Sequence, residues 1–263
     1  MSQLDLDTKK VTKILVGFIR DYCKKAGFKK VVLGLSGGLD SAAVAHLACR
    51  ALGSRNVLAL ILPYKTSNPR GIEDAKRIAR DLKIKTKLID ITPMVDAYYR
   101  RHPDKSRLRK GNKLARERMA ILWDFSAREK ALVIGTGNKT ETLLGYFTLH
   151  GDGAWAFNPI GDLYKSQLRL LARELGVPQR IIDKPPSADL WEGQTDEGEL
   201  GVSYEEVDRL LYYMVDRKYS VPRLRKLGFD SGFIKRVAGI IKDTEFKRKP
   251  PQVARIDYRK IGK

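Results

Sequence analysis

The sequence predicts an α/β protein with a doubly wound parallel sheet and a helical C-terminal portion. Apolar runs of strand length alternate with helix-like segments over the first half of the chain, and a glycine-rich turn links the first run directly to a helix-like sequence. Apolar strands joined by helices suit a parallel sheet covered on both faces. The predicted strands are 31–35, 57–62, 86–89 and 131–135.

The predicted helices account for most of the chain between these strands. Apolar residues recur on one helical face over 11–22, and this first amphipathic helix ends near Gly27. Further helix-like stretches lie at 41–52, 72–82 and 113–129.

Loops at the carboxyl ends of parallel strands form the ligand site in such folds. We therefore expect four loops to converge on one crevice: those at Ser36, at 63–71, from Ile91 onward and at Thr136.

The second half of the chain changes from alternation to helices. A helix over 162–175 is stopped by Gly176, a polar loop covers 184–201, and two apolar helical stripes follow, around Val207 and around Val237. No repeat or low-complexity linker divides the chain. We predict one domain over 1–263, with a sheet core at about 28–160 and a helical part at about 161–263.

Composition limits the class of protein. The chain has 263 residues, of which 43% are hydrophobic, and this is enough for a sizeable core. Its two cysteines, Cys23 and Cys49, lack the spacing of a zinc site or redox pair. Neither a secretory signal nor an apolar run of membrane-spanning length is present, so we expect a cytoplasmic protein with no membrane partner.

The formal net charge of +20 concentrates at 100–118 and in the tail from Lys242. A basic surface is typical of nucleic-acid binding, but a basic ring around a site for a polyanionic small molecule gives the same signature. We expect the second interpretation and no nucleic-acid partner.

The glycine-rich turn is the strongest candidate site. Its glycines allow a tight turn and close backbone approach to a ligand, and the free N–H groups of the following helix favour an anion such as phosphate. Two other interpretations remain open: a bare turn, and a G-x-S-x-G nucleophile elbow at 34–38. The elbow is disfavoured because the histidines, His46, His102 and His150, include none near the C-terminus. The candidate phosphate-binding residues are Gly34, Leu35, Ser36, Gly37, Gly38, Leu39, Asp40 and Ser41.

A second turn also links a predicted strand to the start of a predicted helix. Thr136 follows the strand at 131–135, and Glu141 lies about one helical turn further on, within reach of a cation. Alone, these residues could equally be a helix N-cap and a first-turn acid that complements the helix dipole.

The form S-G-G-x-D-S at Ser36–Ser41 resembles the loop of N-type ATP pyrophosphatases, which belong to the adenine nucleotide α-hydrolase-like superfamily and cleave ATP between the α- and β-phosphates. Together with further motifs in order along the chain, it resembles ammonia-dependent NAD synthetase, whose fold is Rossmann-like. The motifs lie at 34–41, 111–119, 135–141, 145–148, 151–153, 158–165 and 184–201.

The resemblance implies a ligase that forms a C–N bond. ATP would adenylate the nicotinate carboxylate of deamido-NAD⁺ and release pyrophosphate, and ammonia would then give NAD⁺ and AMP. Mg²⁺ would be the cofactor, ATP a co-substrate, and a homodimer the expected assembly. The segments 64–71 and 187–201 would serve as lids.

The resemblance also implies roles for individual residues. Asp40, Lys165 and Glu141 would be catalytic, with Asp40 and Glu141 as magnesium ligands. Thr136, Lys165 and Ser187 match ATP-contacting positions, in addition to 34–41. Arg116, Phe246 and Lys247 match positions that bind deamido-NAD⁺.

Three positions depart from the family pattern. Leu149 and Ala156 replace a lysine and an aspartate that contact deamido-NAD⁺, and Phe246 replaces a histidine. Two alternatives therefore stay open: a relative that adenylates and amidates another carboxylate, and an RNA-modifying ATP pyrophosphatase that uses the same loop.

Overall fold

The computed structural model describes residues 4–185 and 203–257, which include a parallel sheet of four strands. The order across the sheet is β3-β2-β1-β4. This arrangement confirms the predicted fold class, and each strand begins within one residue of its expected start. The strands are β1 (Lys30–Gly34), β2 (Val57–Ile61), β3 (Lys85–Leu88) and β4 (Ala131–Val133).

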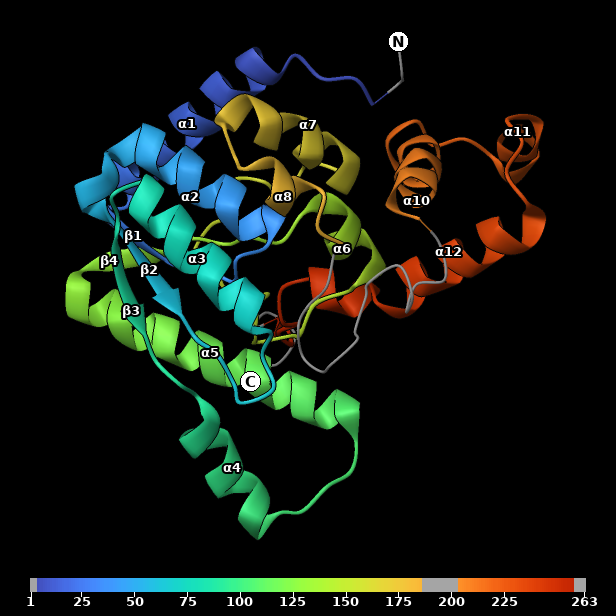
Figure 1. Cartoon of the computed structure of the whole chain (residues 1–263). Helices are drawn as coiled ribbons and strands as arrows, with labels where there is room; N and C mark the ends of the chain where they lie inside the picture. The colour runs from blue at the N-terminus through green and yellow to red at the C-terminus, as the bar shows by residue number, and fades with distance from the viewer. Residues whose placement is uncertain (1–3, 186–202, 258–263) are drawn as a thin grey trace.

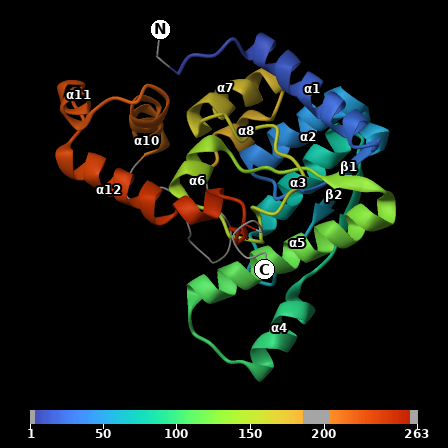
Figure 2. The same ribbon diagram turned by 180° about the vertical axis from the view of Figure 1, so that it is seen from behind.

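Helices cover both faces of the sheet because side chains alternate along each strand. Val31 and Leu33 of β1 join one apolar cluster, whereas Val32 joins the cluster on the other face. The first face carries α1 (Thr8–Lys25), α2 (Leu39–Leu52), α3 (Pro69–Asp81), α7 (Lys165–Leu175) and α8 (Gln179–Ile182). The second carries α4 (Thr92–Arg101) and α5 (Arg107–Glu129), as Figures 1 and 2 show.

The expected open loop from Ile91 onward is wrong, because α4 begins at Thr92. Asp90 accepts a hydrogen bond from the backbone N–H of Thr92, and a proline in the first turn suits a helix start. The next helix, α5, also begins earlier than predicted, at Arg107 rather than Lys113, with Ser106 as its N-cap. The dense positive charge of this region hides the helical period, so capping residues are the only clear signal.

The two edges of the sheet differ. At one edge, all four residues of β3 are exposed, including Lys85 and Lys87. At the other, β4 stops at Val133, two residues before the predicted end, and Ile134 forms a single parallel bridge with Phe157. The segment around Phe157 thus covers the β4 edge, a contact that the sequence did not predict.

The C-terminal helices form a separate apolar cluster beside the sheet. Buried Tyr204, Leu210 and Leu211 pack there with Phe233, and Leu4 of the N-terminal segment joins them. Figure 1 shows these helices in orange and red beyond α6. The elements are α6 (Lys139–Leu144), α10 (Tyr204–Leu211), the π-helix η2 (Tyr212–Asp216), α11 (Val221–Lys226), α12 (Ser231–Asp243) and the short η3 (Glu245–Arg248); a further short helix, η1 (Ser54–Asn56), precedes β2.

The helix predicted over 162–175 begins at Lys165 as α7, with Tyr164 as its N-cap. This start places Lys165 at the carboxyl-end side of the sheet. None of the helices in the described part of the chain is long and apolar enough to cross a membrane.

Candidate active site

The turn between β1 and α2 is held by its own hydroxyl groups. The backbone N–H of Ser36 donates to Oγ of Ser41 at 3.2 Å, and the two serine oxygens lie 3.1 Å apart. The N–H of Gly38 donates to Oγ of Ser36 at 3.2 Å. These bonds fix the loop around the N-terminus of α2, where backbone amides and the helix dipole favour an anion.

Gly37 cannot be replaced without moving the backbone. Its φ of +77° lies in the left-handed region, and a Cβ atom there would lie 2.1 Å from the carbonyl oxygen of Gly71. Gly71 belongs to the first turn of α3. The loop 36–41 is therefore packed directly against a second helix N-terminus, which restricts its shape.

Three predicted residues from distant parts of the chain meet beside this loop. The ammonium of Lys165 lies 2.6 Å from Oδ2 of Asp40 and 3.5 Å from Oε1 of Glu141. Each residue belongs to the first turn of its helix, α7, α2 and α6 respectively. Lys165 is only 4% exposed, so these charges interact with little screening by water.

Asn138 organises this centre and was missed from the sequence. It is fully buried, its side-chain N–H lies 3.4 Å from Oδ2 of Asp40, and its Oδ1 accepts from the N–H of Glu141 at 3.0 Å. In return, the N–H of Asn138 donates to Oε2 of Glu141 at 3.1 Å. This reciprocal pair is a capping box, and the N-x-x-E spacing before α6 was the signal that could have found it.

The carboxylates fit a magnesium ion. Oδ1 of Asp40 is buried and has no hydrogen-bond partner, an arrangement that is costly unless a cation approaches it. Mg²⁺ prefers oxygen ligands and takes one or two protein carboxylates together with substrate phosphates and water. Within 4–185 and 203–257, no group of three or more His, Cys, Asp or Glu side chains forms a metal cluster. Asp40 and Glu141 thus suit a metal that arrives with the nucleotide.

The remaining predicted ATP positions have different outcomes. Thr136 is half-buried in the turn between β4 and α6, so it lies after the strand adjacent to β1. The side chain of Asn158 donates to the carbonyl of Gly137 at 2.7 Å and holds this turn. Ser187 lies outside the described residues, as does the predicted lid at 187–201.

The other predicted lid, 64–71, is tethered rather than open in this structure. Tyr64 is buried, and its hydroxyl donates to Asp96 of α4 at 2.5 Å. Arg118 of α5 donates to the carbonyl of Leu62 at 3.0 Å. The segment is also shorter than expected because α3 already begins at Pro69.

The predicted acceptor residues meet at the turn 145–149. Lys247 donates to the carbonyls of Gly145 and Phe147 at 2.7 and 2.9 Å, and exposed Arg116 donates to the carbonyl of Leu149 at 3.2 Å. Burial lowers the pKa of Lys247. The neighbouring Phe246 is 63% exposed. In this structure Lys247 and Arg116 thus bind backbone carbonyls, and neither contacts the Asp40 carboxylate.

Ala156 occupies an apolar environment. It packs against the cluster beneath the sheet, and its carbonyl accepts from the hydroxyl of Tyr22 at 3.0 Å. An alanine in place of the family aspartate is consistent with these surroundings.

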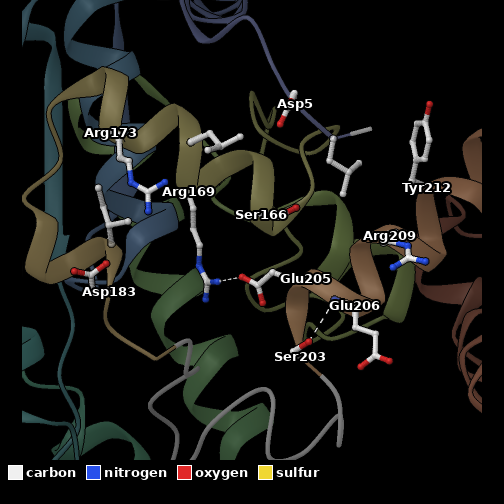
Figure 3. A pocket seen from close by; sticks show the side chains of 13 residues that line it. Asp5, Ser166, Arg169, Arg173, Asp183, Ser203, Glu205, Glu206, Arg209 and Tyr212 are labelled. Atoms are coloured by element: carbon white, nitrogen blue, oxygen red, sulfur yellow. Dashed lines mark hydrogen bonds and ion pairs between the residues drawn. The ribbon is translucent and has the colours of Figure 1, made fainter. Parts of the chain in front are cut away.

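A large cavity lies elsewhere. It has a volume of about 930 Å³ and lies between α7 and α10, where Ser166 and Arg169 face Glu205 and Arg209 (Figure 3). Arg169 of α7 and Glu205 of α10 form an ion pair across it. Of the predicted ATP, metal and acceptor residues that fall within 4–185 and 203–257, none lines this cavity.

Comparison with known proteins decides the family. The family model described as NAD synthase matches residues 11–251. The chain belongs to the NAD synthase family.

Its relatives in this family match over almost their whole length. The protein named NH(3)-dependent NAD(+) synthetase from Trichlorobacter lovleyi is 51% identical, over 100% of this chain and 96% of the relative. Among solved structures, NMN synthetase from Francisella tularensis has a TM-score of 0.85 and 35% identity, covering 96% of this chain and 100% of that one. The NH3-dependent NAD synthetase from Campylobacter jejuni, solved with a nitrate ion, has a TM-score of 0.82 and 37% identity, covering 95% and 100%.

Family membership confirms the expected resemblance and weighs against the alternatives. The hydroxyl of Ser36 lies 3.1 Å from the hydroxyl of Ser41, an arrangement that gives no support to a nucleophile elbow. The RNA-modifying enzyme and the amidase of another carboxylate are likewise not favoured by relatives of about 50% identity that share one name.

Proposed function

We propose that this chain is an ammonia-dependent NAD⁺ synthetase, a ligase that uses ATP to amidate deamido-NAD⁺. The observation that carries the proposal is 51% identity over the whole chain to a relative of that name. The centre formed by buried Lys165 and half-buried Asp40 and Glu141, beside the loop 36–41, supports the proposal.

The first step joins two anions. A carboxylate oxygen of the nicotinate ring attacks the α-phosphorus of ATP, and the bond from that phosphorus to the pyrophosphate oxygen breaks. Amides of the loop 36–41 and the Lys165 ammonium would stabilise the charge that develops on the leaving pyrophosphate. Because Lys165 is buried and already held by two carboxylates, it needs little reorganisation to act.

Asp40 and Glu141 would hold Mg²⁺ against the phosphates, and Mg²⁺ would supply charge neutralisation there. Asp40 would use the buried oxygen that lacks a protein partner. Its other oxygen already accepts from Lys165, so metal and ammonium would share one carboxylate without competing for the same lone pairs.

The second step requires no side-chain nucleophile. The lone pair of ammonia forms a C–N bond to the acyl carbon, the C–O bond to AMP breaks, and one proton leaves the nitrogen. Exclusion of water is the main requirement, because water would hydrolyse the same intermediate. Arg116, Phe246 and Lys247 would bind deamido-NAD⁺ around the turn 145–149, within a homodimer.

Incubation of the purified chain with Mg-ATP, ammonium and deamido-NAD⁺ should yield NAD⁺ and AMP in equal amounts, measured by chromatography. Parallel reactions with nicotinate mononucleotide and other carboxylates test the acceptor. Pyrophosphate release that depends on another carboxylate, but not on deamido-NAD⁺, would overturn the proposal.

A further inference from the structure

A fully buried carboxylate joins three helices next to the candidate active site. Asp208 of α10 is 0% exposed, and it is the only aspartate or glutamate in the buried class among the residues described. No ion pair to Asp208 occurs in 4–185 or 203–257. A buried carboxylate without a paired cation is costly, and an apolar side chain would avoid that cost. Its presence therefore calls for an explanation through its contacts.

Both oxygens of Asp208 bind the segments that carry catalytic groups. Oδ1 accepts from the hydroxyl of Thr140 in α6 at 2.5 Å, and Oδ2 accepts from the N–H of Ser166 in α7 at 2.8 Å. The same threonine oxygen accepts from the N–H of Lys165 at 3.0 Å. The carboxylate thus bonds to the first turn of α7 directly and through a hydroxyl bridge.

These contacts fix the backbone next to Glu141 and Lys165. Thr140 immediately precedes Glu141, and Ser166 immediately follows Lys165. A carboxylate at the N-terminus of α7 also satisfies an N–H group that has no partner within the helix and complements the helix dipole. Asp208 therefore fixes the backbone from which both Glu141 and Lys165 extend.

The same face of α10 also contacts the Lys165 side chain. Tyr204 lies one helical turn before Asp208, and its buried ring is 5.4 Å from the Lys165 ammonium. One helix of the C-terminal cluster thus contacts the backbone of the residue that follows Lys165 and the charged end of the Lys165 side chain. Because Lys165 has a long flexible stem, this double contact reduces the positions that its ammonium can reach.

We propose that Asp208 is a positioning residue that aligns Lys165 and Glu141 for pyrophosphate release, an inference that rests on the proposed function. The carboxylate does not touch the reacting atoms; it acts through Thr140 and the first turn of α7. An amide at position 208 cannot make both contacts: if its oxygen accepts from the N–H of Ser166, its NH₂ group faces Oγ1 of Thr140, and the hydroxyl hydrogen of Thr140 loses its acceptor.

Three single variants and one double variant test the proposal by kinetics. Asp208→Asn and Thr140→Val are expected to lower kcat for NAD⁺ formation by about 10- to 100-fold, with KM for deamido-NAD⁺ changed less than about 3-fold. Thr140→Ser keeps the bridging hydroxyl and should restore most of the turnover. The double variant Asp208→Asn/Thr140→Val should be no slower than the slower single variant, since both break one chain of contacts.

A stability control separates positioning from folding. Asp230 is the N-cap of α12 in the same C-terminal cluster and accepts from the N–H of Phe233 at 2.8 Å. Asp230→Ala should lower the melting temperature but leave kcat unchanged. If Asp208→Asn behaves in the same way, with wild-type kcat per folded molecule, Asp208 is only structural and the proposal is wrong.

The wild-type enzyme distinguishes the two proposals. Absence of deamido-NAD⁺-dependent NAD⁺ formation by folded wild-type protein would refute the proposed function. In that case, the same variants are compared for pyrophosphate release with whichever carboxylate proves active, and unchanged turnover in Asp208→Asn would still refute the positioning role.

Discussion

The nucleotide end and the acceptor end of the candidate site are built in different ways. At the nucleotide end, Asp40, Glu141 and Lys165 extend from the first turns of three helices, and Lys165 is almost completely buried. At the acceptor end, Arg116 is exposed on α5 and Lys247 comes from the short η3 helix. Both of these cations donate to backbone carbonyls of the turn 145–149.

This difference indicates where each end can tolerate change. Helix termini fixed by capping contacts hold charges in one geometry, which the transfer of a phosphoryl-linked group requires. Arg116 and Lys247 instead bind backbone carbonyls of the turn 145–149, and such cations can accommodate other ligand shapes. The departures from the family pattern at Leu149, Ala156 and Phe246 all fall on the acceptor side.

The largest expected effect is at the nucleotide end. Asp40→Ala removes the carboxylate with the unpartnered buried oxygen and leaves Lys165 with one fewer partner. We expect kcat for NAD⁺ formation to fall on the order of 10³-fold. Asp21→Ala, on the exposed surface of α1, is the matched control and should retain full activity. Near-normal turnover in Asp40→Ala would contradict the assigned role.

The loop backbone should be nearly as sensitive. Gly37→Ala places a Cβ atom against the carbonyl of Gly71 and forces a left-handed φ on a residue with a side chain. We expect a loss of about 1–3 kcal/mol in the free energy of unfolding, and a decrease on the order of 10²-fold in kcat/KM for ATP. Denaturant melts and steady-state kinetics measure both.

Gly17 provides the control for this substitution. It lies within α1, and a Cβ atom there would meet nothing within 4 Å. Gly17→Ala should stabilise the protein by about 0.5–1 kcal/mol without changing activity. If Gly37→Ala and Gly17→Ala have the same stability and the same kcat/KM for ATP, the loop 36–41 does not need glycine at position 37.

The acceptor end should show smaller effects that differ between its residues. Arg116→Ala is expected to raise KM for deamido-NAD⁺ about 10-fold with little change in kcat or melting temperature. Lys247→Met should also destabilise the protein, by about 1 kcal/mol, because the carbonyls of Gly145 and Phe147 lose their donor. A fall in kcat alone for Arg116→Ala would contradict a binding role.

The smallest effect concerns pH. Burial raises the pKa of Asp208, and the charge of Glu205 acts in the same direction. The Asp208 carboxyl therefore keeps its proton to a higher pH in the native state than in the unfolded chain, where the pKa of aspartate is about 3.9. The contribution of this raised pKa to the free energy of unfolding is complete below about pH 4 and is lost as pH rises through the native pKa. The excess stability of wild type over Asp208→Asn should fall with pH in urea melts, and a constant difference would contradict the raised pKa.

The fold was predictable because its signals are local. Apolar strand runs and the glycine turn indicated the sheet, and Gly176 marked the end of α7. The region 92–112 was predicted poorly because charged residues mask the helical period there, although Asp90, Ser106 and Pro93 are recognisable start signals.

The site was only partly predictable. Asp40, Glu141 and Lys165 follow from family motifs, and the structure brings their side chains together. Asn138 had only the local N-x-x-E spacing as a signal, and Asp208 had none, because its contacts are distant in sequence. The distance between Thr140 and Asp208, 68 positions along the chain, illustrates why spacing alone could not pair them.

The two edges of the sheet affect how readily copies of this protein aggregate. An open strand edge can pair with another chain and start aggregation, and exposed lysines oppose such pairing. Lys85 and Lys87 protect the β3 edge in this way, and the bridge between Ile134 and Phe157 occupies the β4 edge. With a net charge of +20 adding mutual repulsion, concentrated solutions of this protein should resist growth of intermolecular β-structure.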